Sequence, residues 1–323
     1  MMFFRRDEQL QAWGDRILEN TWAAFPTLAR NQIAMTWLAY EPPYRVNIGG
    51  AITPTEFWQY APAGFSYRGV ECIYPASVVK LFYLVAIHEW FEKGMVQSTP
   101  ELERAIADMI IDSGNDATSL VVDVLTGTTS GPELPPEPFE TWQYQRNIIN
   151  RYYQSLNWNE LQTINVNQKT WCDGAYGRER MFLGEHYDNR NRLTTDATAR
   201  LLHSIVGGVA VSAKRSQIMM ALMQRSLHPE DLKADPENQV TGFLGAGLPL
   251  QARIWSKAGL MSRVRHDAAY IELPDAHPYL LVVFTEGKEH SNNEVLLPFI
   301  SEQVAVAMRS LSQNPELPSL SES

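Results

Sequence analysis

Residues 74–84 read YPASVVKLFYL, which places a serine and a lysine three positions apart at the start of an apolar run. The periodicity predicts a helix over 77–94, so Ser77 and Lys80 would share one face, one turn apart. Ser77 would then lie in the first turn, where backbone N–H groups lack intrahelical partners and the helix dipole is positive. A hydroxyl there can act as a nucleophile if a base is near, and a free N–H can stabilise the resulting oxyanion.

Lys80 can be that base only while its amine is neutral. Burial lowers the pKa of a lysine, and the residues around Lys80 are apolar: Val78, Val79, Leu81 and Phe82. A Ser-x-x-Lys pattern is nevertheless short, and serines at helix starts are common as caps. The pattern therefore indicates catalysis only in company with further motifs.

Two such motifs follow. Ser113–Asn115 (SGN) falls at a break between two predicted helices, where side chains can be presented into a cleft, although an ordinary turn would read the same way. Lys257–Gly259 (KAG) lies on a predicted strand, where a small residue and a glycine let a ligand backbone approach. Taken alone, Lys257–Gly259 would be part of a routine edge strand with a solubilising lysine.

In this order the three motifs match the Ser-x-x-Lys, Ser-Asp-Asn and Lys-Thr-Gly set of penicillin-interacting serine enzymes. The flanking sequence strengthens the match in three places: SGNDATSLVVDVLTG from residue 113, NRLTTDATARLLHSI from 191 and RHDAAYIELPDAHPYLLVVFTEG from 265. From about Ile33 to the last predicted helix, the chain resembles the class A β-lactamases and their penicillin-binding-protein relatives.

The layout is strand-rich at both ends and helical in the middle. We expect an α/β (α+β) fold of the β-lactamase/transpeptidase type, with an antiparallel sheet flanked by terminal helices and an inserted all-α domain. The discontinuous α/β domain would comprise 1–76 and 196–312, the helical domain 77–195, and a disordered tail 313–323. The omega-like loop 157–192 is long for a structureless segment, so we expect it to be functional or ordered by packing.

Periodicity and turn residues also predict individual elements. Helices are expected over 8–24, 77–94, 100–111, 116–125, 139–156, 195–206, 212–227 and 293–311. Strands are expected over 33–40, 44–48, 251–256, 268–273 and 279–284, and residues 65–74 are expected to be irregular.

The resemblance implies an acyl-enzyme route. Ser77 would attack the carbonyl of a β-lactam or of a peptide-like amide or ester, and Lys80 would take the hydroxyl proton directly or through water. Ser113 would relay a proton to the leaving nitrogen, and Asn115 would hold the substrate's amide side chain. The resemblance implies no metal or organic cofactor.

The third motif would complete this machinery. Lys257 would add positive potential for a substrate carboxylate and help to lower the pKa of Lys80. The backbone N–H groups of Ser77 and of Leu260, the residue after Gly259, would form the oxyanion hole.

Three departures from the family pattern bear on activity. Gly114 replaces an aspartate whose role in the family is largely structural. Ala258 replaces a threonine or serine, which removes a hydroxyl for a substrate carboxylate and weakens the case for efficient penicillin hydrolysis. Ser77 and Ser113 are 36 residues apart, a short gap for the family, so a lid or hairpin of the helical domain is expected to be missing.

The deacylation base is the fourth departure. The family carries a glutamate within Glu-x-x-Leu-Asn, and that string is absent from 157–192. Counting from the two flanking segments gives Glu179 from one side and Gln168 or Lys169 from the other. Glu179 and Glu185 are therefore candidates, and the alternative for each is a solvated loop carboxylate. Without such a base, the acyl-enzyme would form but turn over slowly.

Charge and composition bound the partners. The net charge of −10 argues against nucleic-acid or anionic-membrane partners but does not name a substrate. The resemblance implies a small-molecule substrate, and no run reaches transmembrane length. Arg5 and Arg6 are followed by Asp7 rather than by an apolar segment, so a cytoplasmic chain is expected, or a periplasmic one if an upstream leader was omitted. Cys72 and Cys172 give no disulfide framework and are expected to be buried or idle thiols.

Three functions stay open at this point. The first is a serine hydrolase of the class A β-lactamase type, and the second is a D,D-peptidase that acylates but deacylates slowly. The third is a catalytically weak binding or structural homologue, an alternative supported by Ala258 and by the missing glutamate. The chain has neither the His-x-x-x-His spacing of a zinc site nor a Gly-x-Ser-x-Gly elbow.

Overall fold

The structure is a computed structural model that describes residues 2–40 and 52–313. The described residues form two compact units. The α/β unit contains 2–40, 52–69 and 224–313, and the helical unit contains 70–223. Each unit is built around its own buried core, and within the described residues no helix is long and apolar enough to cross a membrane.

The α/β unit is built on a seven-stranded sheet with the order β1-β3-β2-β7-β6-β5-β4. All neighbouring strands are antiparallel except the β1–β3 pair. The strands are β1 Arg5–Arg6, β2 Ile33–Ala39, β3 Ala63–Tyr67, β4 Gln224–Arg225, β5 Arg253–Met261, β6 Val264–Glu272 and β7 Tyr279–Glu286.

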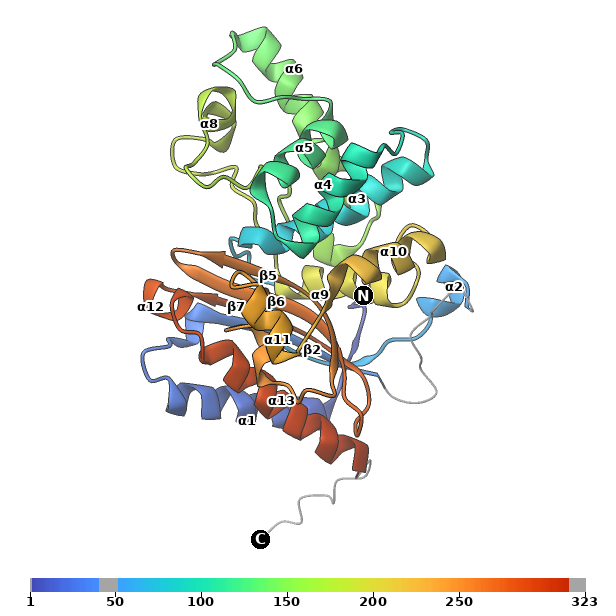
Figure 1. The fold of residues 1–323 in the computed structure, drawn as a ribbon, viewed down its shortest axis with the longest axis vertical. Coiled ribbons are helices and arrows are strands. Elements are labelled where there is room, and N and C mark those ends of the chain that lie inside the picture. Colours follow the sequence, from blue (N-terminus) through green and yellow to red (C-terminus); the bar gives the residue numbers. More distant parts are fainter. Residues whose placement is uncertain (1, 41–51, 314–323) are drawn as a thin grey trace. The chain divides into compact units, whose positions relative to one another are not determined.

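Two long helices, α1 (Glu8–Ala24) and α13 (Leu296–Gln313), lie side by side against one face of this sheet (Figure 1). Asp7 caps α1, because its carboxylate accepts hydrogen bonds from two N–H groups of the first turn. The short helices of the unit are η1 Arg30–Gln32, α2 Pro54–Phe57, α11 Pro229–Ala234, η4 Leu244–Gly247 and α12 Lys288–Ser291.

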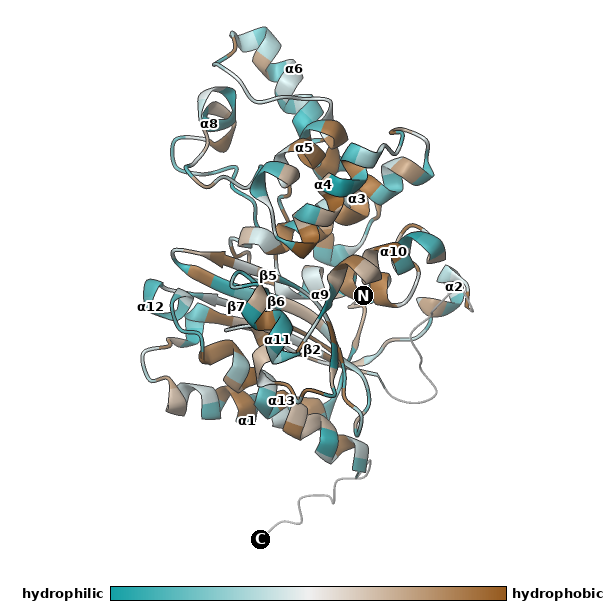
Figure 2. Cartoon of the chain, in the orientation of Figure 1, coloured by the Kyte–Doolittle hydropathy of each residue, from teal (hydrophilic) through white to brown (hydrophobic). Residues whose placement is uncertain are grey.

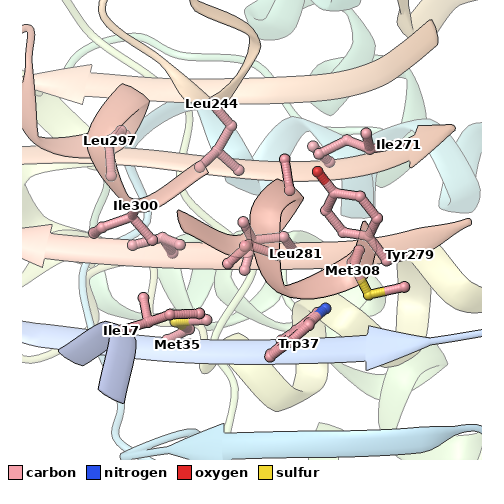
Figure 3. Close-up of a cluster of buried hydrophobic side chains, with 14 of the residues drawn as sticks. Ile17, Met35, Trp37, Leu244, Ile271, Tyr279, Leu281, Leu297, Ile300 and Met308 are labelled. Carbon is pink, nitrogen blue, oxygen red and sulfur yellow. The ribbon is translucent and has the colours of Figure 1, made fainter. Parts of the chain in front are cut away.

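The core of the α/β unit lies between the sheet and these helices. Trp37 of β2, Leu281 of β7 and Ile300 of α13 are fully buried and point into one cluster (Figure 3). Each such side chain contributes about 1.5–3 kcal/mol by leaving water. This packing fixes the register of the strands, because a one-residue slip would turn the apolar side chains away from the helices.

The helical unit is arranged around α3 (Lys80–Glu92), in which ten of the 13 residues are buried. A helix that is apolar on all sides belongs in a core, and Figure 2 shows α3 mostly in brown. The other elements are η2 Ala76–Val79, α4 Pro100–Ile111, α5 Asn115–Thr126, α6 Pro136–Arg146, α7 Ile148–Ser155, η3 Asn159–Leu161, α8 Gly177–Leu183, α9 Thr195–Val206 and α10 Ala213–Met223.

The expected α/β fold class is confirmed, and several elements match their predicted bounds, among them α1, α4 and α9. Several expectations were wrong in detail. Residues 63–67 form β3 instead of irregular chain, and the helix expected over 139–156 is two helices that meet at Asn147. The strand expected over 251–256 runs on to Met261, and the strand expected over 268–273 begins at Val264. The helix expected over 212–227 ends at Met223 and is followed by β4. The loop 157–192 contains α8.

The strand expected over 44–48 and the tail from 314 onward lie outside the described residues. Residues 70–76 and 196–223, which we expected in the α/β domain, group with the helical unit in the structure.

Candidate active site

The Ser77–Lys80 pair sits at the junction of η2 and α3. Ser77 is the second residue of the 3-10 turn, and Lys80 is the first residue of the α-helix that follows. Ala76, immediately before Ser77, has a φ of 46°, a left-handed backbone that non-glycine residues rarely adopt. Such strain costs about 1–3 kcal/mol and persists only where the surrounding structure enforces it.

The ammonium group of Lys80 meets the second motif. Its Nζ donates hydrogen bonds to the carbonyl oxygen of Ser113, to the hydroxyl of Ser113 at 3.2 Å and to Oδ1 of Asn115 at 2.9 Å. Ser113 also has a left-handed backbone, with a φ of 58°, and Asn115 begins α5. The structure therefore brings Lys80, Ser113 and Asn115 together within the helical unit.

Lys80 is fully buried, and this burial lowers its pKa from the ordinary 10.5 to about 7. A negative charge on Cys172 opposes this shift. At neutral pH a substantial fraction of Lys80 is therefore an uncharged amine, which can accept a proton. Ser77 is half-buried, and within the described residues its hydroxyl makes no hydrogen bond.

Cys172 is a neighbour of this cluster that the sequence analysis missed. Nδ2 of Asn115 donates a hydrogen bond to Sγ of Cys172 at 3.2 Å, so one amide links the thiol to Lys80. Cys72 and Cys172 are both free and both exposed, so of the two expected alternatives, buried or idle thiols, the buried one is wrong. No spacing in the sequence could have located Cys172, because the loop that carries it reaches Asn115 only through tertiary folding.

Glu179 is fully buried in a network of charges, so the alternative of a solvated carboxylate was wrong for this residue. Arg146 binds both of its oxygens, at 2.8 and 3.0 Å, and the hydroxyl of Ser130 donates to Oε1 at 2.7 Å. Among the residues described, Glu179 forms no hydrogen bond or ion pair with Lys80. Glu185, the other candidate, is an exposed loop residue.

Lys169 and Asp123 extend this network. Nζ of Lys169 lies 2.8 Å from a carboxylate oxygen of Asp123 on α5 and 3.8 Å from Oε1 of Glu179. Burial raises the pKa of Asp123, and Lys169 and Arg146 act against this shift. The network thus joins the loop over 157–192 to α5 and α6 by charge-assisted hydrogen bonds.

The third motif lies on β5 of the α/β unit. Nζ of Lys257 donates to Oε1 of Gln239 and to the carbonyl oxygen of Ala258, and the Ala258 N–H donates to the same Gln239 oxygen at 3.1 Å. Lys257 and Gly259 are buried, whereas Leu260 is half exposed. Gln239 is thus a partner of the motif that sequence reasoning did not find.

The pairing of β5 leaves part of one edge open. On that side β4 pairs only with Ile254 and Trp255, whereas β6 pairs along the whole strand on the other side. Within the described residues, the segment 257–260 therefore has a strand neighbour on one side only, while the side chains of Gln239 and Lys257 bind the backbone of Ala258.

In the part of the chain that the structure describes, no three His, Cys, Asp or Glu side chains are grouped so that they could hold a metal ion.

His88 on α3 is buried, and its burial lowers its pKa to about 4. In the described structure both of its ring nitrogens lack a hydrogen-bond partner. His88 is therefore a packed neutral imidazole.

Similarity to solved structures defines the fold. A β-lactamase from Sphaerobacter thermophilus is 18% identical, with 94% of this chain and 98% of that chain covered and a TM-score of 0.61. A PBP-A variant in an acyl-enzyme complex with penicillin G is 17% identical, with 95% and 98% covered and a TM-score of 0.62. The class A β-lactamase of the last common ancestor of Gram-negative bacteria is 17% identical, with 92% and 99% covered and a TM-score of 0.57.

Sequence comparison reaches the same group. No curated protein is significantly similar to the chain. The model of the β-lactamase enzyme family, however, matches residues 92–307, a range that contains the second and third motifs and begins after Lys80. With its mixed sheet-and-helix fold, the chain belongs to the β-lactamase enzyme family.

Proposed function

We propose that this chain is a serine hydrolase that forms an acyl-enzyme on Ser77 with a β-lactam or a related peptide-like amide or ester. The observation that carries the proposal is the state of Lys80. It lies one turn after Ser77, is fully buried, and has a pKa lowered to about 7. A general base is most effective when its pKa lies near the working pH.

In the acylation step, the Ser77 oxygen attacks the carbonyl carbon while its proton passes to the neutral amine of Lys80, directly or through water. The carbon–nitrogen bond of the substrate then breaks, and the leaving nitrogen needs a proton. Ser113 can deliver it, because its hydroxyl lies 3.2 Å from the newly formed ammonium of Lys80. The proton that left Ser77 would thus return through Ser113.

Asn115 would have two tasks in this scheme. Its Oδ1 holds Lys80 by a 2.9 Å hydrogen bond. Its NH₂ group carries two hydrogens, so it can donate to a substrate amide carbonyl in addition to Cys172. Replacing Asn115 would therefore affect both substrate binding and the orientation of the base.

For the β5 motif we propose roles rather than distances. Lys257 would supply positive potential for a substrate carboxylate. The N–H of Leu260, after Gly259, would act with the N–H of Ser77 on the oxyanion. The end of β5 supports this, because β4 does not extend to Leu260, which is half exposed.

We further propose that the acyl-enzyme is hydrolysed slowly, in the manner of a penicillin-binding D,D-peptidase. The specific observation is that Glu179 is occupied by Arg146 and Ser130 and has no hydrogen bond or ion pair with Lys80 in the described structure. A carboxylate held in this way is poorly placed to activate a water. The acyl-enzyme complex of the PBP-A variant with penicillin G shows that this type of intermediate can be captured on the same fold.

Intact-mass spectrometry after mixing with penicillin G tests the proposal. We expect one penicilloyl adduct that is absent from Ser77→Ala and present in Ser98→Ala, a control at an exposed serine. An adduct that persists for minutes or longer supports slow deacylation, and rapid loss with release of hydrolysed penicillin indicates a β-lactamase instead. Absence of adduct with penicillin G and with simple activated esters would refute the proposal and leave the catalytically weak homologue.

A further inference from the structure

Cys172 occupies a chemically unusual place. Its Sγ accepts a hydrogen bond from Nδ2 of Asn115 at 3.2 Å, and Oδ1 of the same amide accepts from Lys80 at 2.9 Å. The charge of Cys172 is also felt by Lys80 through space. An exposed thiol is therefore one side chain away from the buried general base.

The loop before Cys172 is held firmly in position. Tyr83, three residues after Lys80 on α3, donates from its hydroxyl to the carbonyl oxygen of Gln168 at 2.6 Å. Lys169 is tied to Asp123 by the 2.8 Å ion pair described above. Because these contacts fix the chain three residues before Cys172, the position of the thiol near Asn115 is a consequence of the fold.

The residues between the anchored stem and the thiol contain unsatisfied polar atoms. In the described structure Oγ1 of Thr170 and Nε1 of Trp171 are buried and have no hydrogen-bond partner. Buried polar groups normally find partners. Both residues directly precede Cys172 in the chain.

We propose that Cys172 is a modification site at which a low-molecular-weight disulfide switches off the acylation machinery. This inference rests on the proposed function of Ser77 and Lys80. In the step, the thiolate of Cys172 attacks one sulfur of the small disulfide. A new sulfur–sulfur bond forms on Cys172, the original one breaks, and the other half leaves as a thiolate.

The modification acts on two groups at once. A substituent on Sγ removes the hydrogen bond from Asn115 and adds bulk beside the amide that would hold the substrate. Without access to Asn115 and Lys80, the substrate does not reach Ser77 in a reactive position.

Cys72 provides a matched control within the same chain. It is also free and exposed, but its Sγ lies 3.5 Å from the carbonyl oxygen of Thr163. In the described residues it makes no hydrogen bond to Lys80 or Asn115. Modification of Cys72 should therefore leave the acylation rate unchanged.

The experiment uses 2,2′-dithiodipyridine, a small disulfide whose reaction releases an absorbing thiopyridone. Wild type, Cys172→Ser and Cys72→Ser are treated, the modified residue is identified by mass, and the rate of penicillin acylation of each is compared before and after treatment. We expect a loss of at least about tenfold in wild type and in Cys72→Ser, since general-base catalysis and its positioning are worth more than that. Dithiothreitol should restore the rate, and Cys172→Ser should be insensitive.

A second readout separates this inference from the proposed function. Thiopyridone release is measured at neutral pH, without penicillin, in wild type, Cys172→Ser and Cys72→Ser. Because both thiols are exposed, wild type should release two equivalents and each variant one, with the labelled residue identified by mass. This result can be obtained even if penicillin never acylates Ser77.

Two outcomes would overturn the inference. One is complete modification of Cys172, verified by mass, with an unchanged acylation rate. The other is a Cys172 that remains unlabelled in the folded protein under conditions that label Cys72. If untreated wild type is not acylated at all, it is the proposed function that fails.

Discussion

Nζ of Lys80 lies 2.9 Å from Oδ1 of Asn115. The two residues come from different helices, α3 and α5, and each stands on the first turn of its helix. Because Lys80 is buried, this hydrogen bond and those to Ser113 are what compensate its loss of water. Burial nevertheless outweighs these hydrogen bonds and keeps the pKa of Lys80 low.

Removal of the base should abolish efficient acylation. We expect Lys80→Ala to lower the rate of penicillin acylation by about 10²–10⁴-fold, the usual worth of a general base. Lys93→Ala, at an exposed lysine directly after α3, is the matched control and should keep the wild-type rate. The acylation rate of both variants is measured by quenching the reaction at set times and recording intact-mass spectra. Equal rates in the two variants would contradict the role of Lys80.

The acylation rate should depend on pH through Lys80. Its pKa is lowered to about 7 by burial, and only the neutral amine accepts the serine proton. The rate should therefore fall about tenfold per pH unit below pH 7 and level off above it. A profile from pH 5 to 9 that is flat, or that rises toward acid, would be incompatible with this assignment.

The same pKa shift makes a prediction for stability. Between about pH 7 and 10.5 the unfolded chain holds a proton on Lys80 that the folded chain does not hold. Stability from this group therefore rises with pH across that window. In Lys80→Met this contribution is absent, so the free energy of unfolding, measured in urea at several pH values, should rise less with pH than in wild type.

Glu179 should matter for stability more than for chemistry. Its removal in Glu179→Ala leaves Arg146 buried without its main partner, and loss of one member of a buried ion pair costs about 3–5 kcal/mol. Glu185→Ala, at an exposed carboxylate, should change the free energy of unfolding by less than about 0.5 kcal/mol. If Glu179 were the deacylation base, its variant would instead prolong the acyl-enzyme at unchanged stability.

The alanine of the third motif offers a gain-of-function test. Ala258→Thr introduces a hydroxyl where the family carries one, and a hydrogen bond to a charged group is worth about 1.5–3 kcal/mol. We expect penicillin G, which has a carboxylate, to acylate the variant at least about tenfold faster, while an ester without a carboxylate reacts at the wild-type rate. An equal increase in acylation rate for both substrates, or no increase for either, would show that the new hydroxyl does not act on the substrate carboxylate.

Much of the fold and part of the site could be predicted from sequence, because both depend on local pattern. Ser77 and Lys80 lie at a helix start that periodicity predicts, and the break at Ser113 is visible between two amphipathic stretches. The strand β3 was missed because its residues, AGFSY, are short and contain a glycine, which weakens any strand signal.

The remaining part of the site depends on long-range contacts. The loop that carries Cys172 is shaped by amide hydrogen bonds such as those from Gln168 and Asn167 N–H groups to the side chain of Asn191. No sequence pattern in residues 157–192 predicts these bonds. Counting along the loop could therefore predict neither the burial of Glu179 nor the contact between Cys172 and Asn115. Polar loops are ordered by specific side-chain hydrogen bonds, and hydrogen bonds between residues far apart in the sequence leave no periodic pattern in it.

The left-handed backbone at Ala76 has an implication for engineering. A glycine would adopt this conformation without strain, so Ala76 is a position at which a more robust protein is one substitution away. The same freedom would loosen the peptide that positions Ser77, the proposed nucleophile, and activity often depends on a strained site that costs stability. The Cβ methyl group of Ala76 thus lowers the stability of the folded chain and at the same time restricts the backbone next to Ser77.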